Sequence, residues 1–364
     1  MKVSDITRVM EGIAPARLAE PWDRVGLQVG DADADVRSLL VAMTPTLDLL
    51  CEAVDRGVQM VICHHPLIFK PLSALTGSSP VERIAAGLLK HDIAFFAAHT
   101  NYDSATGGVN DALAAALGIR EVQPLSTLDT KLVKIAVFVP AEALEKVSAA
   151  ICDAGAGRIG AYSHCTFRIP GTGTFLPLEG AHPYAGEPHK LEQVAEIRLE
   201  SVAPEEAVPD VVAAIRRSHP YEEPAFDIYP LQNARREMGL GRFGLLEQPM
   251  RAADFVAEVV RRLNTPCVHF AGDPGKSVSK VAVCGGAGGD LVKDALSHRC
   301  DLLVTGDVRY HTFLEAADSG LIVVDAGHAP TEWPGVVALF ERLQATLPIT
   351  VLLSDREMSA IRHA

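Results

Sequence analysis

Two adjacent histidines, His64 and His65, follow a short apolar segment and precede Pro66. The apolar run at residues 59–63 predicts a buried strand, and the proline ends it because proline has no N–H to donate to a sheet. Neighbouring side chains in an extended chain point apart, so two successive histidines suit two metal ions better than one. Taken alone, the pair also fits two histidines that are hydrogen-bonded or face solvent.

A second apolar run, residues 93–98, ends in His99, and Asp103 follows four residues later. At the carboxyl edge of a parallel sheet, Asp103 could supply an oxygen ligand, while His99 could bind metal or hydrogen-bond to a ligand. The alternative is structural, because Asn101 and Asp103 could form an Asx-turn. We interpret Asn110 as the N-cap of the following helix.

A third apolar run, residues 321–325, leads to His328, with Glu332 four residues further on. That spacing brings an imidazole and a carboxylate to one side of a helical turn. Imidazole and carboxylate without thiolate favour zinc, iron, manganese, cobalt or nickel. If Glu332 bridges, the set makes two open sites of the hydrolase type, whose ions lie roughly 3.5 to 4 Å apart. The candidate ligands are His64, His65, Asp103, His328 and Glu332.

Helix and strand patterns alternate along the first part of the chain, residues 1–128, which favours a mostly parallel sheet covered by helices. We interpret the stretch at residues 22–30 as a glycine-containing loop with a half-buried Trp22. Helical spacing occurs at residues 3–13 and 47–56, and strand-length apolar runs occur at 38–43, 59–63 and 93–98.

The middle part, residues 129–232, has a different pattern. Its elements follow the order strand, helix, strand, strand, helix, strand, which is the split βαβ arrangement of ferredoxin-like folds. Turn-rich stretches at residues 125–129 and 231–241 are its expected linkers. Within it, residues 219–224 carry a histidine and two glutamates that, together with Cys165, could form a second metal site, although we favour a structural role. Its predicted strands are 131–139, 166–175, 194–199 and 225–229, and its predicted helices are 141–154 and 208–218.

The last part, residues 233–364, returns to the α/β pattern and is expected to complete the domain begun by residues 1–128. A glycine-rich turn at residues 285–290 connects a strand at 280–284 to a helix at 291–298. Such a turn could hold an anion at the helix amino end, but it lacks the GxGxxG spacing and the lysine of nucleotide-binding loops. We favour a tight turn and leave phosphate contact open.

Composition restricts the classes of function. The 364 residues carry a net charge of −13, and the basic residues form no long run, which argues against binding nucleic acid. No stretch approaches the ~20 apolar residues of a membrane span, and the first residues lack the layout of a signal peptide, so a cytoplasmic protein is expected. The seven cysteines have no CxxC spacing and are expected to be reduced.

Six linked motifs resemble those of one family. WDRVGLQVG, CHHPLIF, HTNYD followed by GGVNDALA, CGGAGG, TGDVRYH and GHAPTE are similar to the GTP cyclohydrolase I type 2 homologues, the Nif-three-like dinuclear metal proteins. In the middle part, GAGRIGAYSHCTF, GTGTF and HPYEEPAFDIY resemble the PII-like or CutA-like insert of the longer members. The resemblance covers nearly the whole chain.

The resemblance implies a two-lobed α/β metal domain interrupted by a ferredoxin-like insert, commonly assembled as a hexameric ring. It places the ligands of two divalent ions, preferably zinc, iron or manganese, on the five residues above. His99 and His311 match positions that line the pocket and would transfer protons. This chain differs from the usual motifs at two positions, with Arg24 in place of an asparagine and Thr44 in place of an aspartate.

Two functions follow as alternatives. One is a metal-dependent hydrolase acting on a nucleotide or related small molecule, with ring opening of GTP as one possible reaction. The other is a non-catalytic metal-holding or regulatory protein that binds a small molecule or a protein partner. The second is favoured by the lack of a dedicated motif for a purine or ribose.

Overall fold

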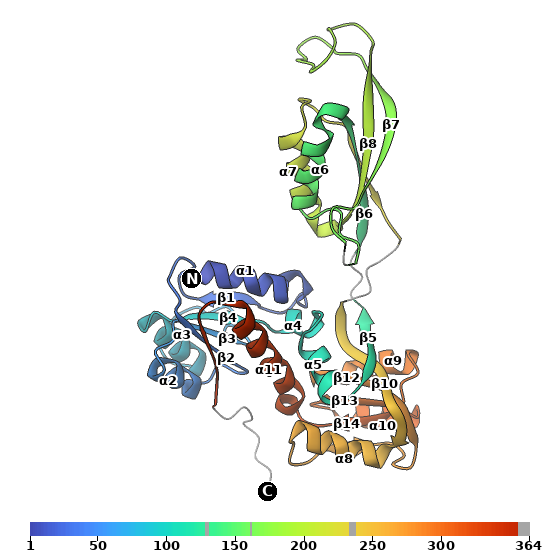
Figure 1. The fold of residues 1–364 in the computed structure, drawn as a ribbon. Coiled ribbons are helices and arrows are strands. Elements are labelled where there is room, and N and C mark those ends of the chain that lie inside the picture. The colour runs from blue at the N-terminus through green and yellow to red at the C-terminus, as the bar shows by residue number, and fades with distance from the viewer. Residues whose placement is uncertain (128–130, 161, 233–237, 356–364) are drawn as a thin grey trace. The chain divides into compact units, whose positions relative to one another are not determined.

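The structure is a computed structural model, which describes residues 1–127, 131–160, 162–232 and 238–355. The chain divides into two compact units. Residues 1–128 and 237–364 form the first, and residues 129–236 form the second. The first unit contains two sheets and the second contains one (Figure 1).

The first sheet has the strand order β1-β4-β3-β2-β15, in which β1 is antiparallel to β4 and the remaining neighbours are parallel. Alternate residues of the parallel strands pack into cores on opposite faces, one containing residues of α1 and α11 and the other residues of α2 and α3. The elements are β1 (Gly26–Val29), β2 (Ser38–Ala42), β3 (Met60–Cys63), β4 (Ala94–Ala97), β15 (Thr350–Leu353), α1 (Val3–Ile13), α2 (Leu47–Asp55), α3 (Pro80–Lys90) and α11 (His328–Thr346).

The loop predicted at residues 22–30 is wrong in its second half, because β1 lies there. Only Val29 of this strand is buried, so the segment has little of the apolar pattern that identifies a strand. Its conformation depends on antiparallel pairing with β4 at the edge of the sheet. Trp22 is more exposed than expected, at 55%.

The second sheet has the order β11-β14-β13-β12-β10-β5. Its central strands β12, β13 and β14 are parallel, and β11, β10 and β5 pair antiparallel with their neighbours. The elements are β5 (Arg120–Thr127), β10 (Gly239–Arg251), β11 (His269–Ala271), β12 (Ser277–Ala287), β13 (Leu302–Gly306), β14 (Ile322–Asp325), α5 (Val109–Ala116), α8 (Ala252–Leu263), α9 (Val292–Ser297) and α10 (Tyr310–Asp318).

Two stretches predicted as linkers are partly strand. Residues 125–127 belong to β5 and residues 239–241 to β10, and Gly239 pairs with Thr127. Residues 231, 232 and 238 lie outside the strands, and the predicted linker positions 128–129 and 233–237 lie outside the described residues. The strand β5 was not predicted, because its sequence contains Pro124 and is mostly polar. Both features are tolerated in a strand at the edge of a sheet.

The two sheets of the first unit are joined by helices that cross between them. α11 leaves β14 in the second sheet and leads to β15 in the first, and α4 (Thr100–Ser104) with α5 connects β4 to β5. Arg242 of β10 is 2% exposed and connects the second sheet to the segment that contains α4 and α5. Its guanidinium donates to both carboxylate oxygens of Asp111 at 2.8 and 2.9 Å and to the Ala105 carbonyl at 3.0 Å.

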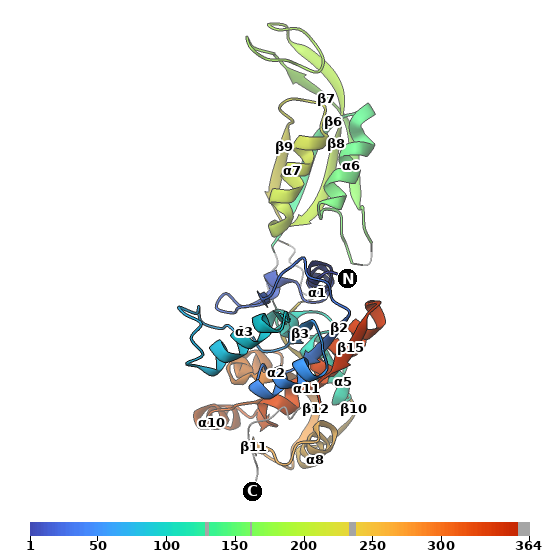
Figure 2. The same ribbon diagram turned by 90° about the vertical axis from the view of Figure 1, so that its left-hand side faces the viewer.

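The second unit has a four-stranded antiparallel sheet of order β7-β8-β6-β9. With two helices on one face, this is the predicted ferredoxin-like order (Figure 2). The β7–β8 hairpin extends well past the helices, and β8 is longer than expected. The elements are β6 (Leu132–Pro140), α6 (Leu144–Asp153), β7 (Thr166–Phe175), β8 (Glu192–Pro204), α7 (Val208–Ser218) and β9 (Phe226–Pro230).

His219 in the second unit supports the structural interpretation of residues 219–224. Its Nε2 lies 2.9 Å from the Phe138 carbonyl, and its Nδ1 accepts from the Tyr221 amide at 3.1 Å. With both ring nitrogens bonded to backbone, the imidazole has no lone pair left for a metal.

All seven cysteines are free, and four of them are buried. Within the described ranges, no helix has the length and apolar character needed to cross a membrane.

Candidate metal centre

The five predicted ligands come together in the first unit. Nε2 of His64 lies 3.6 Å from Oδ1 of Asp103 and 3.4 Å from Oε1 of Glu332. Nε2 of His65 lies 3.0 Å from Oε2 of Glu332, and Nε2 of His328 lies 3.0 Å from Oε1 of Glu332. The Glu332 carboxylate is therefore within ion-pair distance of three imidazoles.

The candidate ligands lie at or just beyond the ends of β3, β4 and β14 or in the helices that follow these strands. His64 and His65 follow β3, and Asp103 lies on α4, just after β4, which pairs parallel to β3. His328 and Glu332 occupy the first turn and a half of α11, where the spacing of four residues puts them on one face. Gly327 precedes this helix with φ of 88°, a conformation that favours glycine.

The other ring nitrogen of each histidine is bonded to a second group. Nδ1 of His64 lies 2.8 Å from the Ala98 carbonyl, and Nδ1 of His328 lies 2.7 Å from Oδ2 of Asp307. Both acceptors lack hydrogen, so these nitrogens carry the proton and direct Nε2 to the centre. Nδ1 of His65 lies 2.8 Å from Oγ1 of Thr44, a group that can donate or accept.

Three atoms of the cluster are buried and have no hydrogen-bond partner of good geometry: Nε2 of His64, Oδ1 of Asp103 and Oε2 of Glu332. Buried polar atoms in folded proteins are almost always bonded, so this arrangement requires another group. The unsatisfied atoms are an imidazole nitrogen and two carboxylate oxygens, which are ligands of divalent transition metals. The residues therefore fit a metal centre.

Two groups of ligand atoms are compact enough to hold an ion. In one group, the atoms of His65, His328 and Glu332 lie within 4.8 Å of one another. In the other, the atoms of His64, His65 and His99 satisfy the same limit. The second group includes His99, which the sequence left open as either a ligand or a hydrogen-bonding neighbour.

The charges of the cluster influence one another. Burial lowers the pKa of His64, but the negative charges of Glu332 and Asp103 outweigh it and raise that pKa to about 9. The hydrogen bond to Glu332 raises the pKa of His328 to about 9, whereas burial lowers the pKa of His65. Burial raises the pKa of Asp103 to about 6. Burial opposes the ionisation of Glu332, but the charge of His64 and the hydrogen bonds from the imidazoles outweigh it and lower the pKa of Glu332.

His99 lies beside the cluster and is held by a buried carboxylate. Its ring centroid is 5.3 Å from that of His64 and 5.7 Å from that of His65. Its Nδ1 lies 2.9 Å from Oδ1 of Asp23, whose other oxygen accepts from the Thr100 hydroxyl at 2.5 Å. Burial opposes the ionisation of Asp23, but the bonds from His99 and Thr100 hold its pKa at about 2. Sequence reasoning missed Asp23 because the surrounding stretch was interpreted as a loop.

His311 is placed differently. It is exposed in the first turn of α10, and its ring lies 5.6 Å from that of Tyr310. Within the part of the chain that the structure describes, it has no hydrogen bond or ring contact with the five candidate ligands. The neighbouring Asp307 of the same motif reaches the cluster instead, through its bond to His328.

The glycine-rich turn serves the cluster by leaving space. Gly286 has φ of 65°, and a Cβ there would collide with Oε1 of Glu332 and lie 3.3 Å from Nε2 of His328. The amides of Gly285, Gly286 and Gly288 already donate to side-chain oxygens of Asn110, Thr331 and Thr305. These amides are therefore not free to bind a phosphate, which favours the tight-turn interpretation.

Asn110 is not the helix cap that its position suggested. It lies inside α5, fully buried, and Gly108 occupies the N-cap. Its amide nitrogen donates to the Asp103 carbonyl at 3.0 Å, and its oxygen accepts from the Gly285 amide at 2.8 Å. Asn110 thus links the segment that carries Asp103 to the glycine-rich turn.

The two unusual positions of the sequence have different surroundings. Thr44 follows β2 and contacts His65, so it orients one candidate ligand. Arg24 is exposed, and its guanidinium donates to the carbonyl of Asp23 at 3.0 Å. Its side chain therefore lies next to the residue that holds His99.

Two sheets that meet around a cluster of histidines and carboxylates define an α/β protein with a candidate metal site. The chain matches the model of the Duf34/NIF3 (NGG1p interacting factor 3) family over residues 1–359, and it belongs to that family. The resemblance seen in its motifs is thereby confirmed.

Individual relatives agree with this assignment. A Bacillus subtilis protein named GTP cyclohydrolase 1 type 2 homolog is 43% identical over 89% of this chain and 87% of its own length. A protein of the same name from Halalkalibacterium halodurans is 40% identical over 90% of this chain and 89% of its own. The crystal structure of a Bacillus cereus protein related to NIF3 is 38% identical and has a TM-score of 0.88, covering 100% of this chain and 99% of the other.

Proposed function

We propose that His64, His65, Asp103, His328 and Glu332 hold two divalent metal ions and that the centre is the active site of a hydrolase. The observation that carries the proposal is the position of Glu332, whose two oxygens lie within 3.4 Å of three imidazole nitrogens while it is 2% exposed. A carboxylate in that position can bridge two cations. His65 and His328 would belong to one ion, and His64 and Asp103 to the other.

Divalent ions held there would supply Lewis acidity, which polarises carbonyl and phosphoryl oxygens and makes water more acidic. The chain itself supplies a proton acceptor. Because ionised Asp23 can only accept a hydrogen bond, Nδ1 of His99 carries the hydrogen and Nε2 keeps its lone pair. Nε2 of His99 would take a proton from water, and the Asp23 charge would stabilise the resulting imidazolium.

A planar substrate is supported by aromatic residues next to the centre. The ring of Trp22 lies 6.2 Å from His99 and 5.9 Å from Phe69, and both Trp22 and Phe69 are substantially exposed, at 55% and 44%. Exposed aromatic faces stack well on nucleobases. The name of the relatives, GTP cyclohydrolase 1 type 2 homolog, points in the same direction, so we propose a nucleotide or a related heterocycle as the substrate.

The experiment combines metal analysis with turnover. The chain is purified without added metal, its metal content is measured, and zinc-, iron- and manganese-loaded samples are assayed against nucleotides, including GTP, and phosphoesters. We expect two ions per chain and metal-dependent hydrolysis of at least one substrate, with His65→Ala inactive. Bound metal without turnover across the panel would contradict the hydrolase and favour the alternative.

That alternative is a metal-holding or regulatory protein without catalysis. The observation in its favour is a cavity of about 540 Å³ in the second unit, and none of the five candidate ligands lines it. The likeness of this unit to PII-like and CutA-like domains stays a prediction. Assembly as a hexameric ring is also a prediction, which light scattering during size-exclusion chromatography would test.

A further inference from the structure

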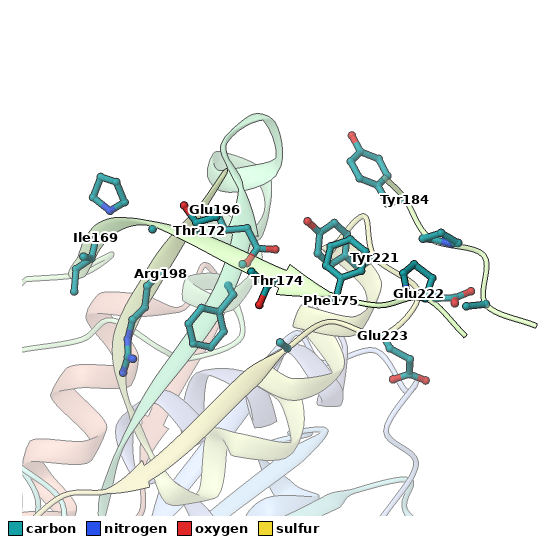
Figure 3. Close-up of a pocket in the computed structure, with 18 residues that line it drawn as sticks. Ile169, Thr172, Thr174, Phe175, Tyr184, Glu196, Arg198, Tyr221, Glu222 and Glu223 are labelled. Carbon is teal, nitrogen blue, oxygen red and sulfur yellow. The ribbon is translucent and has the colours of Figure 1, made fainter. Parts of the chain in front are cut away.

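The cavity of the second unit lies on the sheet face opposite its helices. Val137 and Val139 of β6 pack in the core with α6 and α7, so Phe138 between them points to the other face. Glu196 and Arg198 of β8 line the cavity on that face, and the β7 backbone at residues 169–175 forms one wall (Figure 3). The volume of about 540 Å³ is in the usual range for a small-molecule site.

Glu196 is the unusual residue of this cavity, because it is a carboxylate that is 9% exposed. A Cβ on Gly173 would collide with its side-chain oxygens, so the glycine of β7 leaves the room that the carboxylate occupies. Within the described ranges, no basic side chain forms an ion pair with Glu196. A buried carboxylate without a cationic partner is costly and requires an explanation.

The nearby basic residue is already engaged elsewhere. Arg198 donates from Nε to Oε1 of Glu200 at 2.9 Å, and its guanidinium lies over the rings of Phe138 and Tyr229. Lys134 also pairs with Glu200, at 3.3 Å. In Figure 3 the Arg198 guanidinium lies at the end of the cavity away from Tyr184 and Glu222. At the end that contains Glu196, neither of these basic residues pairs with the carboxylate.

Aromatic rings surround that negative end. The ring of Tyr221 lies 5.8 Å from Tyr184 and 6.3 Å from Phe175. The hydroxyl oxygen of Tyr221 is buried and has no hydrogen-bond partner of good geometry. Burial raises the pKa of Tyr221, and the interaction of its hydroxyl with the Glu196 carboxylate, through a poorly aligned hydrogen bond and the negative charge, raises it further. Tyr221 is therefore a neutral phenol whose oxygen can accept a hydrogen bond.

Further acidic groups lie at the rim. Glu222 accepts from the amide of His182 at 3.0 Å, which ties the hairpin loop to the turn after α7. Tyr184 on that loop donates to Glu142 at 3.3 Å. Glu223 also lines the cavity and is exposed. The lining is thus aromatic and negative, which disfavours phosphates and carboxylates as ligands.

We propose that this cavity binds an organic amine, with the ammonium group against Glu196 and Tyr221 and the apolar or aromatic body between Tyr184, Phe175 and Phe138. An ammonium donates three hydrogen bonds and is attracted to aromatic faces, so it satisfies both the carboxylate, which has no cationic partner, and the phenol oxygen. A bare divalent cation fits less well, because it prefers six or more oxygen ligands and the walls are largely apolar. The site is independent of the metal centre.

The test measures binding to the full chain with a chelator present, so that the amine cannot coordinate a metal. The probes are 2-phenylethylamine, 4-phenylbutylamine, 2-phenylethanol and phenylacetate, which share an aromatic body and differ in charge. Saturation-transfer NMR and calorimetry at millimolar concentration detect weak binding. We expect both amines to bind at least about tenfold more tightly than the alcohol, and the carboxylate not to bind.

Two variants locate the effect. Glu196→Gln should remove the preference for the amine over the alcohol, and Glu145→Gln, an exposed acid on α6, should keep it. The melting temperature of Glu196→Gln should equal or exceed that of the wild type, because a buried charge without a cationic partner is removed. The proposal is overturned if no amine binds, if amine and alcohol bind equally, or if folded Glu196→Gln keeps the preference.

Discussion

Nε2 of His65 lies 3.3 Å from Nε2 of His328, although 263 positions separate the two residues in the chain. Two nitrogens that each lie about 2.0 to 2.1 Å from one tetrahedral zinc ion are separated by about 3.3 Å. The two imidazoles are therefore already spaced as ligands of a shared ion. His328 is held in this position by Asp307, and His65 is held by Thr44.

Replacing the carboxylate between the imidazoles should affect both proposed ions. We expect Glu332→Gln to lower metal affinity by more than about a hundredfold. This loss exceeds the roughly 10- to 100-fold typical for removing a residue that only hydrogen-bonds to a metal ligand. Calorimetric titration and metal analysis measure this loss. Glu341→Gln, on the exposed side of the same helix, is the control and should bind as the wild type does. One ion that stays tightly bound in Glu332→Gln would contradict a bridging role.

The glycine-rich turn allows a test of whether Glu332 needs the space that Gly286 leaves. Gly286→Ala should lower metal affinity, because the new methyl group displaces Glu332, and should destabilise the fold by about 1 to 3 kcal/mol through its positive φ. Gly289→Ala is the matched control, since a Cβ there meets only Thr312, at 3.6 Å. Metal titrations and melting curves compare the two variants. Equal affinities in both would show that the turn does not shape the site.

Protons should compete with metal over an alkaline interval. In the metal-free protein the pKa values of His64 and His328 are raised to about 9 from 6.5. Groups with a raised pKa stabilise the folded state fully below pH 6.5, and this contribution is lost as the pH rises through 9. Metal binding requires the same nitrogens without protons, so its contribution should grow over that interval.

The melting temperature of the chelated protein should therefore fall between pH 6.5 and 9, while its difference from the metal-loaded protein increases. Two other groups do not reverse this trend. His65 has a lowered pKa and titrates below the interval, and the carboxyl of Asp103 loses its proton near pH 6. Melting curves with and without chelator make the measurement. A difference that stays constant from pH 6.5 to 9 would argue against histidine ligands.

The hydroxyl next to His65 allows a finer test. Thr44→Val keeps the shape of the side chain but removes the bond to Nδ1, so we expect metal affinity to fall about tenfold. Thr44→Ser preserves the hydroxyl and should bind nearly as the wild type does. Competition with a chromophoric chelator gives both affinities. Similar losses in Thr44→Val and Thr44→Ser would point to packing rather than to the hydrogen bond.

The second unit should be dispensable for metal binding. Gly239 pairs with Thr127 in adjacent antiparallel strands, so a short turn can join them in place of the residues between. We expect this shortened chain to fold and to contain the same number of metal ions per chain as the full protein. Metal analysis of the monodisperse protein checks the expectation. A folded but metal-free product, with unchanged assembly, would contradict it.

Local patterns predicted most of the elements. The helix at residues 3–13 has the predicted bounds, and strands β2, β3 and β14 lie within the predicted runs at 38–43, 59–63 and 321–325. Amphipathic spacing and apolar runs mark such segments directly. Strands β1 and β5 escaped prediction because each lies at a sheet edge with few buried residues. For such strands, hydrogen bonds to a distant partner outweigh their weak local preference.

The five candidate ligands could be found from the sequence, because each follows an apolar strand or lies one helical turn beyond a histidine that does. The residues that orient them could not. Asp23 is 76 positions from His99, and Thr44 and Asp307 each lie 21 positions from the histidine that they contact. Such contacts depend on which strands are neighbours and on how two sheets meet, and no local pattern encodes either. The sequence by itself determined which chemical groups could bind metal, and the tertiary structure decided which nitrogen of each imidazole faces the centre and where a glycine must leave room.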